Sequence, residues 1–178
     1  RTLDGPGRTP AVAAATTEDT PVTVTLSGAG GTRHLADWPP PGSRDRTWFL
    51  RADHSLSPQA PPEHGDGAVR WQGTHVDYDP ADPTPAVGGP ILTGRSGPRD
   101  QAPLEARPDV AVFTSGVLPE DVVALGPASA TVHLRAEVDH LDVFVRVCDV
   151  DPRGRSVNVT DGLVRLLPDA PPRAPDGS

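Results

Sequence analysis

Proline and glycine interrupt this sequence so often that they limit the length of any regular element it can form. The 178 residues include 23 Pro and 18 Gly, concentrated at 1–10, 39–42, 57–67, 79–98 and 168–177. Proline lacks a backbone donor and disrupts helix interiors, and glycine weakens both helices and strands. The chain is therefore expected to fold through short elements that lie between these interruptions.

The segments between the interruptions alternate apolar and polar residues, as half-buried strands do. In "PVTVTLSG" (21–28), valines and a leucine alternate with threonines and a serine. No window contains a sustained apolar repeat at helical spacing. The sequence therefore predicts an all-β sandwich or barrel. Its further expected strands are 47–52, 109–115, 120–127, 130–138, 142–150 and 162–166.

Two connections and one long segment complete this organisation. The residues "DHL" are short enough to join 130–138 and 142–150 as a hairpin, and "DPRG" (151–154) is a typical turn with Pro second and Gly fourth. Residues 53–108 show little periodicity. A segment of that length inside a domain is functional, covers a neighbour or is disordered.

Charge and cysteine content exclude several classes of function. The net charge of -8 argues against nucleic acid and anionic membrane surfaces as partners, because both attract concentrated basic patches. The single Cys148 excludes an internal disulfide and a zinc site built on paired thiolates. No cofactor or metal is expected, no apolar run is long enough to span a membrane, and a cytoplasmic location is the default. The chain begins with Arg and contains no Met, which suggests a piece of a longer polypeptide whose secretion signal could lie upstream.

The candidate reactive residues each have a simpler structural interpretation. "GRSGP" (94–98) has Pro98 where a nucleophile elbow needs Gly, which disfavours Ser96 as a nucleophile. Cys148 lies among valines and is expected to pack in the core. "DYDPAD" (77–82) lacks the Gly and Glu of a calcium loop and is expected to be a turn with solvated acids. "NVT" (158–160) fits a glycosylation acceptor, but so short a match carries little weight.

The acids of "DVFVRVCDVDPRGRSVNVTDGLVR" (142–165) form the most conspicuous cluster. They occupy strand ends and turns, where Asp accepts hydrogen bonds from local backbone. Arg146 is placed to pair with one of them. A structural role is therefore favoured over a catalytic or metal site for Asp142, Asp149, Asp151 and Asp161.

The order of several motifs resembles one known family. These motifs are "DWPPPG" (37–42), "YDPADPTPAVGG" (78–89), "GPRDQAPLEARPDVAVFTSGVLPEDVVALGP" (97–127) and the stretch 142–165. In this order they resemble the C-terminal β domain of the cocaine esterase / X-Pro dipeptidyl-peptidase family of serine hydrolases, over about residues 20 to 166.

The resemblance implies a noncatalytic role. In that family the catalytic Ser, Asp and His belong to an α/β-hydrolase domain upstream of the "DWPPPG" equivalent, and nothing in residues 1–36 matches them. The resemblance implies a jelly-roll-like, galactose-binding-like sandwich that packs on the catalytic domain of the same polypeptide, in an enzyme that cleaves esters or amides. It also implies that Ile91, Leu92 and Thr93, just after Gly88 and Gly89, approach the acyl side of the substrate. The alternative is packing inside this domain, since Ile91 and Leu92 are of types common in protein cores.

The expected domain layout follows from the same resemblance. Residues 1–20 are expected to link to the catalytic domain, 21–167 to form the sandwich with the long loop 53–108, and 168–178 to form a Pro-rich tail or linker. Family members continue past "DGLVR" through further strands, including a Phe-x-x-Gly-His segment. The sandwich is therefore expected to be incomplete at its C-terminal end, with exposed apolar surface.

Two other classes of function remain open from the residues. A free-standing carbohydrate- or ligand-binding sandwich normally uses aromatic platforms, and this chain has few aromatic residues, Trp38, Trp48 and Tyr78 among them. An independent enzyme needs a nucleophile–base pair, which the sequence does not reveal. Association of copies of the chain into a homo-oligomer is compatible with each of these alternatives.

Overall fold

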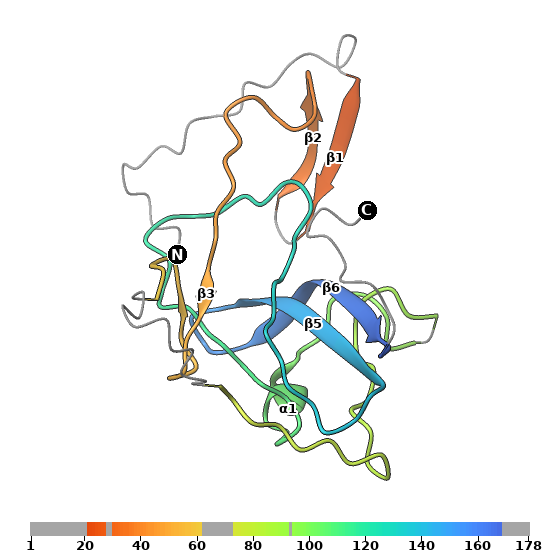
Figure 1. Ribbon diagram of the computed structural model, residues 1–178. Helices are drawn as coiled ribbons and strands as arrows, with labels where there is room; N and C mark the ends of the chain where they lie inside the picture. The colour runs from red at the N-terminus through yellow and green to blue at the C-terminus, as the bar shows by residue number, and fades with distance from the viewer. Residues whose placement is uncertain (1–20, 28–29, 62–72, 93, 169–178) are drawn as a thin grey trace. The chain divides into compact units, whose positions relative to one another are not determined.

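The computed structural model describes residues 21–27, 30–61, 73–92 and 94–168. The described strands pair as three two-stranded antiparallel sheets, β1 with β2, β3 with β4 and β5 with β6, and helix among these residues is limited to one turn (Figure 1). The expectation of an all-β chain is confirmed. The elements are β1 (Val22–Leu26), β2 (Gly31–Leu35), β3 (Phe49–Leu50), β4 (Leu56–Ser57), α1 (Ala102–Glu105), β5 (Leu141–Val150) and β6 (Ser156–Leu166).

The chain divides into two compact units. The first comprises Arg1–Thr74 and Val112–Gly126, and contains β1 to β4. The second comprises His75–Ala111 and Pro127–Ser178, and contains α1, β5 and β6. The segment 53–108 thus contributes to both units. The expected linker at 1–20 and residues 169–178 of the expected tail lie outside the described residues.

In the first unit, β1 has the burial pattern that its sequence predicts. Its residues alternate between half-buried and exposed along the strand, and Val22 pairs with Leu35 of β2. Leu35, with an exposed fraction of 3%, is the only hydrophobic side chain among the described residues that is fully buried. The strand β2 was not predicted, because "GTRHL" has no apolar alternation.

The segment around Thr114 joins β4 through two backbone hydrogen bonds. Leu56 N–H donates to Thr114 O and Thr114 N–H donates to His54 O, each at 3.0 Å. The imidazole of His54 stacks on Phe113 with ring centroids 5.5 Å apart. A parallel bridge between Ser55 and Thr114 is the only strand-like pairing within the predicted strand 109–115.

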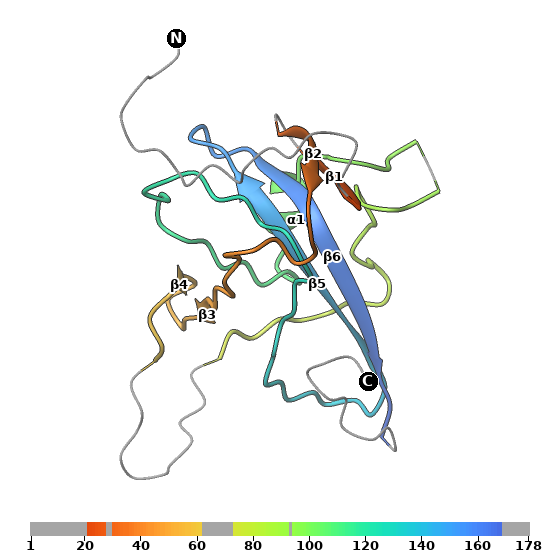
Figure 2. The same cartoon turned by 90° about the horizontal axis from the view of Figure 1, so that it is seen from above.

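The second unit is built on the long hairpin of β5 and β6, which lie side by side in both views (Figures 1 and 2). The turn between these strands is the predicted "DPRG" turn. Gly154 N–H donates to Asp151 O at 2.9 Å, and the Asp151 carboxylate accepts the N–H groups of Arg153 and Arg155. This turn therefore satisfies its own backbone donors and pairs β5 with the segment that follows it.

Three predicted strands are wrong. Residues 120–127 and 130–138 have no strand pairing, and 109–115 has only the bridge at Thr114. The "DHL" hairpin is likewise not formed, since β5 pairs with β6, which begins at Ser156 rather than at 162. The physical reason is that β-branched residues fit a half-buried sheet, but a strand forms only where a second segment lies alongside to pair with it. The composition of a segment does not specify that second segment.

A β-bulge in β6 changes the face of the hairpin on which Asn158 lies. Val147 pairs with Thr160 and Cys148 with Asn158, so Val159 has no partner. Strict alternation would place Asn158 and Asp161 on opposite faces, because they are three residues apart. The extra residue brings both side chains to the face that carries Arg146.

Candidate functional site

The predicted site residues belong to the second unit, in the segment between Gly89 and Gly97, which we call the excursion. Gly89 and Gly97 exchange two backbone hydrogen bonds of 3.0 Å, and Gly88 N–H donates to Arg95 O at 2.9 Å. These hydrogen bonds close the base of the excursion. This gives the excursion a defined starting point, although residues 90–96 form no strand in the described part.

The three predicted residues differ in exposure and in description. Leu92 has an exposed fraction of 106%, so its side chain contacts nothing that would shield it. Ile91 is half-buried. Thr93 lies outside the described residues. Packing of Leu92 in the core of its own unit, the alternative to a role at a substrate, does not occur in this structure.

The base of the excursion rests on an arginine of β5. The Arg146 guanidinium donates to the backbone oxygen of Val87 and, at 2.6 Å, to Gln101 Oε1. Its Nη2 lies 2.9 Å from Asp161 Oδ2. The guanidinium carbon also lies 4.9 Å from the centre of the Phe144 ring, a cation–π distance. Arg146 thus pairs with one of the acids of its own stretch, as the sequence suggested.

Two amide side chains complete the support. Asn158 Oδ1 accepts hydrogen bonds from the backbone N–H of Arg99 and from Gln101 Nε2, and Asn158 Nδ2 donates to Gly97 O at 3.3 Å. Gln101 Nε2 also donates to Val87 O at 3.2 Å, and Gln101 has an exposed fraction of only 2%. We call Gln101, Arg146, Asn158 and Asp161 the polar platform.

The paired glycines are required by their closeness to this platform. A Cβ on Gly88 would lie 2.5 Å from Asn158 Oδ1, and a Cβ on Gly89 would lie 2.6 Å from Asp161 Oδ2. Both glycines have positive φ, 77° and 76°. Side chains at either position would therefore collide with the platform and strain the backbone.

The segment that follows the excursion is held against β6. Gln101 N–H donates to Ser156 O at 2.8 Å, and Asp100 bridges Val157. Glu105, in the helical turn α1, accepts a hydrogen bond from the Ser156 hydroxyl at 2.5 Å. The excursion is consequently anchored on both of its flanks by the same hairpin.

The other acids of the conspicuous stretch also have structural roles. Asp142 accepts two hydrogen bonds from Arg165, which lower the pKa of its carboxyl. Backbone donation, first from Arg155, lowers the pKa of Asp151 at the turn. The structural interpretation is thus supported for Asp142, Asp151 and Asp161, and Asp149 pairs with Val157 of β6 in the strand ladder.

A second ion-pair cluster was not anticipated from the sequence. Arg107 donates to both carboxylate oxygens of Asp109 and to Asp82, and Thr84 donates to Asp109 at 2.5 Å. Donation first from Arg107 and then from Thr84 lowers the pKa of Asp109 to about 2. This cluster joins residues 82–84 to 107–109.

The remaining candidates for chemistry show no assembled site. Burial raises the pKa of the half-buried Cys148 thiol, which keeps it protonated at neutral pH. Ser96 is exposed, and among the described residues no histidine is hydrogen-bonded to it. Asp79 accepts the Ala81 N–H, so the acids of 77–82 do form a turn. Across residues 21–27, 30–61, 73–92 and 94–168, no three His, Cys, Asp or Glu side chains are grouped to hold a metal ion.

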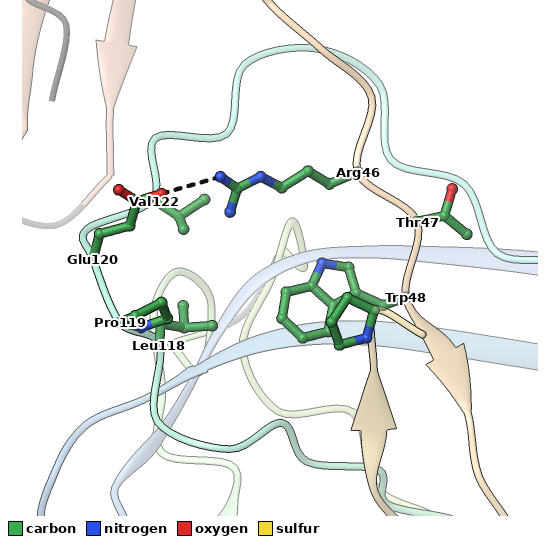
Figure 3. A pocket seen from close by; sticks show the side chains of 8 residues that line it. Arg46, Thr47, Trp48, Leu118, Pro119, Glu120 and Val122 are labelled. Atoms are coloured by element: carbon green, nitrogen blue, oxygen red, sulfur yellow. Dashed lines mark hydrogen bonds and ion pairs between the residues drawn. The ribbon is translucent and has the colours of Figure 1, made fainter. Parts of the chain in front are cut away.

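The first unit contains a separate open groove with a cavity volume of about 330 Å³. Figure 3 shows the Trp48 indole opposite Leu118 and Pro119, with Arg46 reaching toward Glu120 at a distance of 3.3 Å. The groove is mainly apolar, and its ion pair is exposed. Its lining residues are Arg46, Thr47, Trp48, Pro58, Leu118, Pro119, Glu120 and Val122.

The sequence predicted where the candidate site residues lie, but not which side chains hold the base of the excursion in place. Asn158 was noticed only as part of "NVT", whereas its amide is buried and makes hydrogen bonds on both sides. Gln101 lies in a segment that was expected to be a loop. The paired glycines were the one signal available, because adjacent glycines often mark a close approach of backbone to another group. Among the described helices, none is long and apolar enough to cross a membrane.

Comparison with known proteins places the whole described region in one family. The family model for the X-Pro dipeptidyl-peptidase C-terminal non-catalytic domain matches residues 14–170. Cocaine esterase from Rhodococcus sp. (strain MB1 Bresler) is 30% identical over 142 residues, which cover 75% of this chain and 24% of the esterase. The chain thus spans about a quarter of the length of that relative. No solved structure matches. The chain belongs to the family of X-Pro dipeptidyl-peptidase C-terminal non-catalytic domains.

Proposed function

We propose that this domain serves a serine hydrolase that cleaves ester or amide bonds, and that it packs on the α/β-hydrolase catalytic domain of the same polypeptide. Ile91, Leu92 and Thr93 then contribute to the mouth of the active site on the acyl side of the substrate. The domain, residues 21–167, is a jelly-roll-like sandwich of the galactose-binding-like type, with 1–20 as the incoming linker and 168–178 as the tail.

The exposure of Leu92 is the observation that carries this proposal. Burying a leucine side chain contributes roughly 1.5–3 kcal/mol, which Leu92 does not gain within its own unit. The excursion that carries it is closed by the Gly89–Gly97 hydrogen bonds, so its base is held in place. An apolar side chain presented in this way suits contact with a second domain or with an acyl group.

Further exposed apolar residues support a partner domain. They include Val117 in the first unit and Phe144 and Leu163 in the second. Scattered exposed apolar residues are normal in soluble proteins, but the scarcity of buried hydrophobic side chains among the described residues supports the proposal that a partner domain covers part of this apolar surface. The match covers 24% of cocaine esterase, so most of that relative lies outside the matched segment and leaves room for a catalytic domain.

The proposal is tested in the complete polypeptide that carries both domains. Leu92→Ala is compared with the unaltered enzyme for kcat/KM on a short and a bulky acyl ester, alongside Tm. Removing apolar contact with an acyl group changes such a ratio by roughly 10- to 200-fold. An unchanged ratio would show that Leu92 does not contact the acyl group.

A ligand-binding module is the second candidate, and the groove of the first unit favours it. Trp48 offers an indole face beside an open cavity of about 330 Å³. Aromatic faces stack well on apolar surfaces of ligands, sugars included. Calorimetric titration with mono- and oligosaccharides distinguishes the two: binding that disappears in Trp48→Ala supports the module, and absence of heat for every sugar excludes carbohydrate binding.

A further inference from the structure

We infer that Phe144 and Leu163 form the centre of a docking surface on the second unit, and that the catalytic domain of the same polypeptide covers it. This inference rests on the proposed function, which pairs the two domains without saying which surface they share. It assigns one face of the β5–β6 hairpin to that contact.

The two side chains are neighbours across the hairpin. Phe144 of β5 pairs with Leu163 of β6 in the antiparallel register, so both side chains lie on the same face. Phe144 is 53% exposed and Leu163 is 64% exposed. An aromatic and an aliphatic side chain therefore form one exposed apolar patch instead of two isolated residues.

Segments of the second unit cover the next part of this face but leave the patch open. Arg146 and Asp161, the next pair on the same face, are 13% and 15% exposed, and the base of the excursion and Gln101 lie against them. The Arg146 guanidinium also contacts the Phe144 ring, with its central carbon 4.9 Å from the ring centre. The patch thus begins where the covered part of the face ends.

Charged side chains border the patch on its other side. Asp142 and Arg165 pair one step further along the same face, with Nε and Oδ1 2.7 Å apart and side chains 39% and 71% exposed. Protein–protein interfaces commonly have an apolar centre in which aromatic residues are enriched, surrounded by a polar rim. The arrangement on this face therefore suits contact with the surface of another folded domain.

Two observations favour the catalytic domain over a second copy of this chain as the occupant. The base of the excursion that contains Leu92 lies on the same face of the hairpin, beside Arg146 and Asp161. A domain that meets Leu92 in the proposed way would therefore approach this face. The match covers only 24% of cocaine esterase, so a polypeptide of that kind has a large remainder that can cover the patch.

Photo-cross-linking in the complete two-domain polypeptide identifies the occupant. Phe144→p-benzoylphenylalanine keeps an aromatic ring in the patch and, under ultraviolet light, forms a covalent bond with the group that lies against it. Mass spectrometry of the digested product is expected to show a link from position 144 to a peptide of the catalytic domain. The same substitution at Leu163 should reach the same region, because the two positions are in register.

Val147 provides the matched control. It is 48% exposed, close to the value of Phe144, but it lies three residues further along β5 and before the bulge, which places it on the opposite face. Val147→p-benzoylphenylalanine is expected to give no link to the peptide that position 144 reaches. The same link from both faces would overturn the assignment.

Other cross-linking results would also overturn the inference. These are a link from position 144 only to peptides of this domain, a link between two copies of the chain, and no link at all. Mixing isotopically labelled and unlabelled protein before irradiation distinguishes links between copies from links within one molecule.

Leu92 separates failure of this inference from failure of the proposed function. If Leu92→Ala changes the ratio of kcat/KM between the two acyl esters but position 144 links to nothing in the catalytic domain, only this inference is overturned. If position 144 links to the catalytic domain and the ratio is unchanged, the acyl role of Leu92 fails and the docking surface stands. If neither result is obtained, both are overturned.

Thermal unfolding gives an independent check. Phe144→Thr combined with Leu163→Thr removes the apolar patch but keeps residues that favour strands. This variant should lower the Tm of the complete polypeptide by several degrees more than the Tm of this chain alone, because the patch is already exposed in the chain alone. Equal decreases in the two proteins would contradict the inference.

Discussion

Arg146 and Asp161 face each other across the β5–β6 hairpin, with Nη2 and Oδ2 2.9 Å apart and side chains that are 13% and 15% exposed. Arg165 and Asp142 form a second pair in the same register, but their side chains are 71% and 39% exposed. Two pairs of identical chemistry thus differ in surroundings. The enclosed pair supports the Gly88–Gly89 loop, and the other lies against solvent.

This contrast predicts unequal effects on stability. Asp161→Asn should lower Tm more than Asp142→Asn, because it leaves the enclosed Arg146 cation without its counter-charge, whereas water replaces the partner of Arg165. Thermal unfolding followed by circular dichroism measures both variants side by side. Equal shifts in Tm would mean that the enclosure of the first pair has no energetic consequence.

Acid should destabilise the second unit through Asp109. Hydrogen bonds from Arg107 and Thr84 hold its pKa at about 2, below the ordinary value of 3.8. A depressed pKa in the folded state contributes stability that is fully present above the unfolded pKa and disappears as pH falls through the folded pKa. Part of the loss of Tm between pH values of about 4 and about 2 should therefore be absent in Asp109→Asn. Parallel Tm profiles for the two proteins over this window would contradict the assignment.

Alanine at the paired glycines should destabilise the domain. Gly88→Ala places a Cβ against Asn158, and its positive φ adds strain of roughly 1–2 kcal/mol in a non-glycine residue. Gly94→Ala is the control, because nothing lies within 4 Å of its added Cβ. Urea unfolding should give a lower midpoint for Gly88→Ala and nearly the original midpoint for Gly94→Ala.

Truncation to alanine should affect stability little at Leu92 and strongly at Leu35. Leu92→Ala is expected to change the free energy of unfolding of the isolated chain by no more than about 0.5 kcal/mol, as at other exposed positions. Leu35→Ala removes a buried side chain and should cost about 2–5 kcal/mol. A large decrease in the free energy of unfolding of Leu92→Ala would contradict the exposed position of this side chain.

The chain alone should have no esterase activity above background. Ser96 lacks a hydrogen-bonded histidine among the described residues, and the sequence around it has Pro98 in place of the second glycine of a nucleophile elbow. Turnover of a nitrophenyl ester by the purified chain is the direct measurement. Activity that disappears on Ser96→Ala would refute this prediction.

The sequence by itself determined the all-β class, the strand β1, most of β5, the turn at Asp151 and the family. These features depend on local information: alternation gives one apolar face to Val22, Val24 and Leu26, and Asp with Pro and Gly favours a tight turn. The sequence could not show which segments lack a partner, so 120–127 and 130–138 were predicted as strands on composition alone.

Only the tertiary structure decided how the candidate site is supported. The bulge at Val159 brings Asn158 to the face of Arg146 and Asp161, and no pattern of alternation indicates such a change. Gln101 reaches the same platform from a segment that is distant in sequence from β6. The exposure of Leu92 could not be predicted either, because the residue type alone does not determine whether a leucine is buried or exposed. Side-chain burial depends on which distant segments meet, and only the folded chain brings these together.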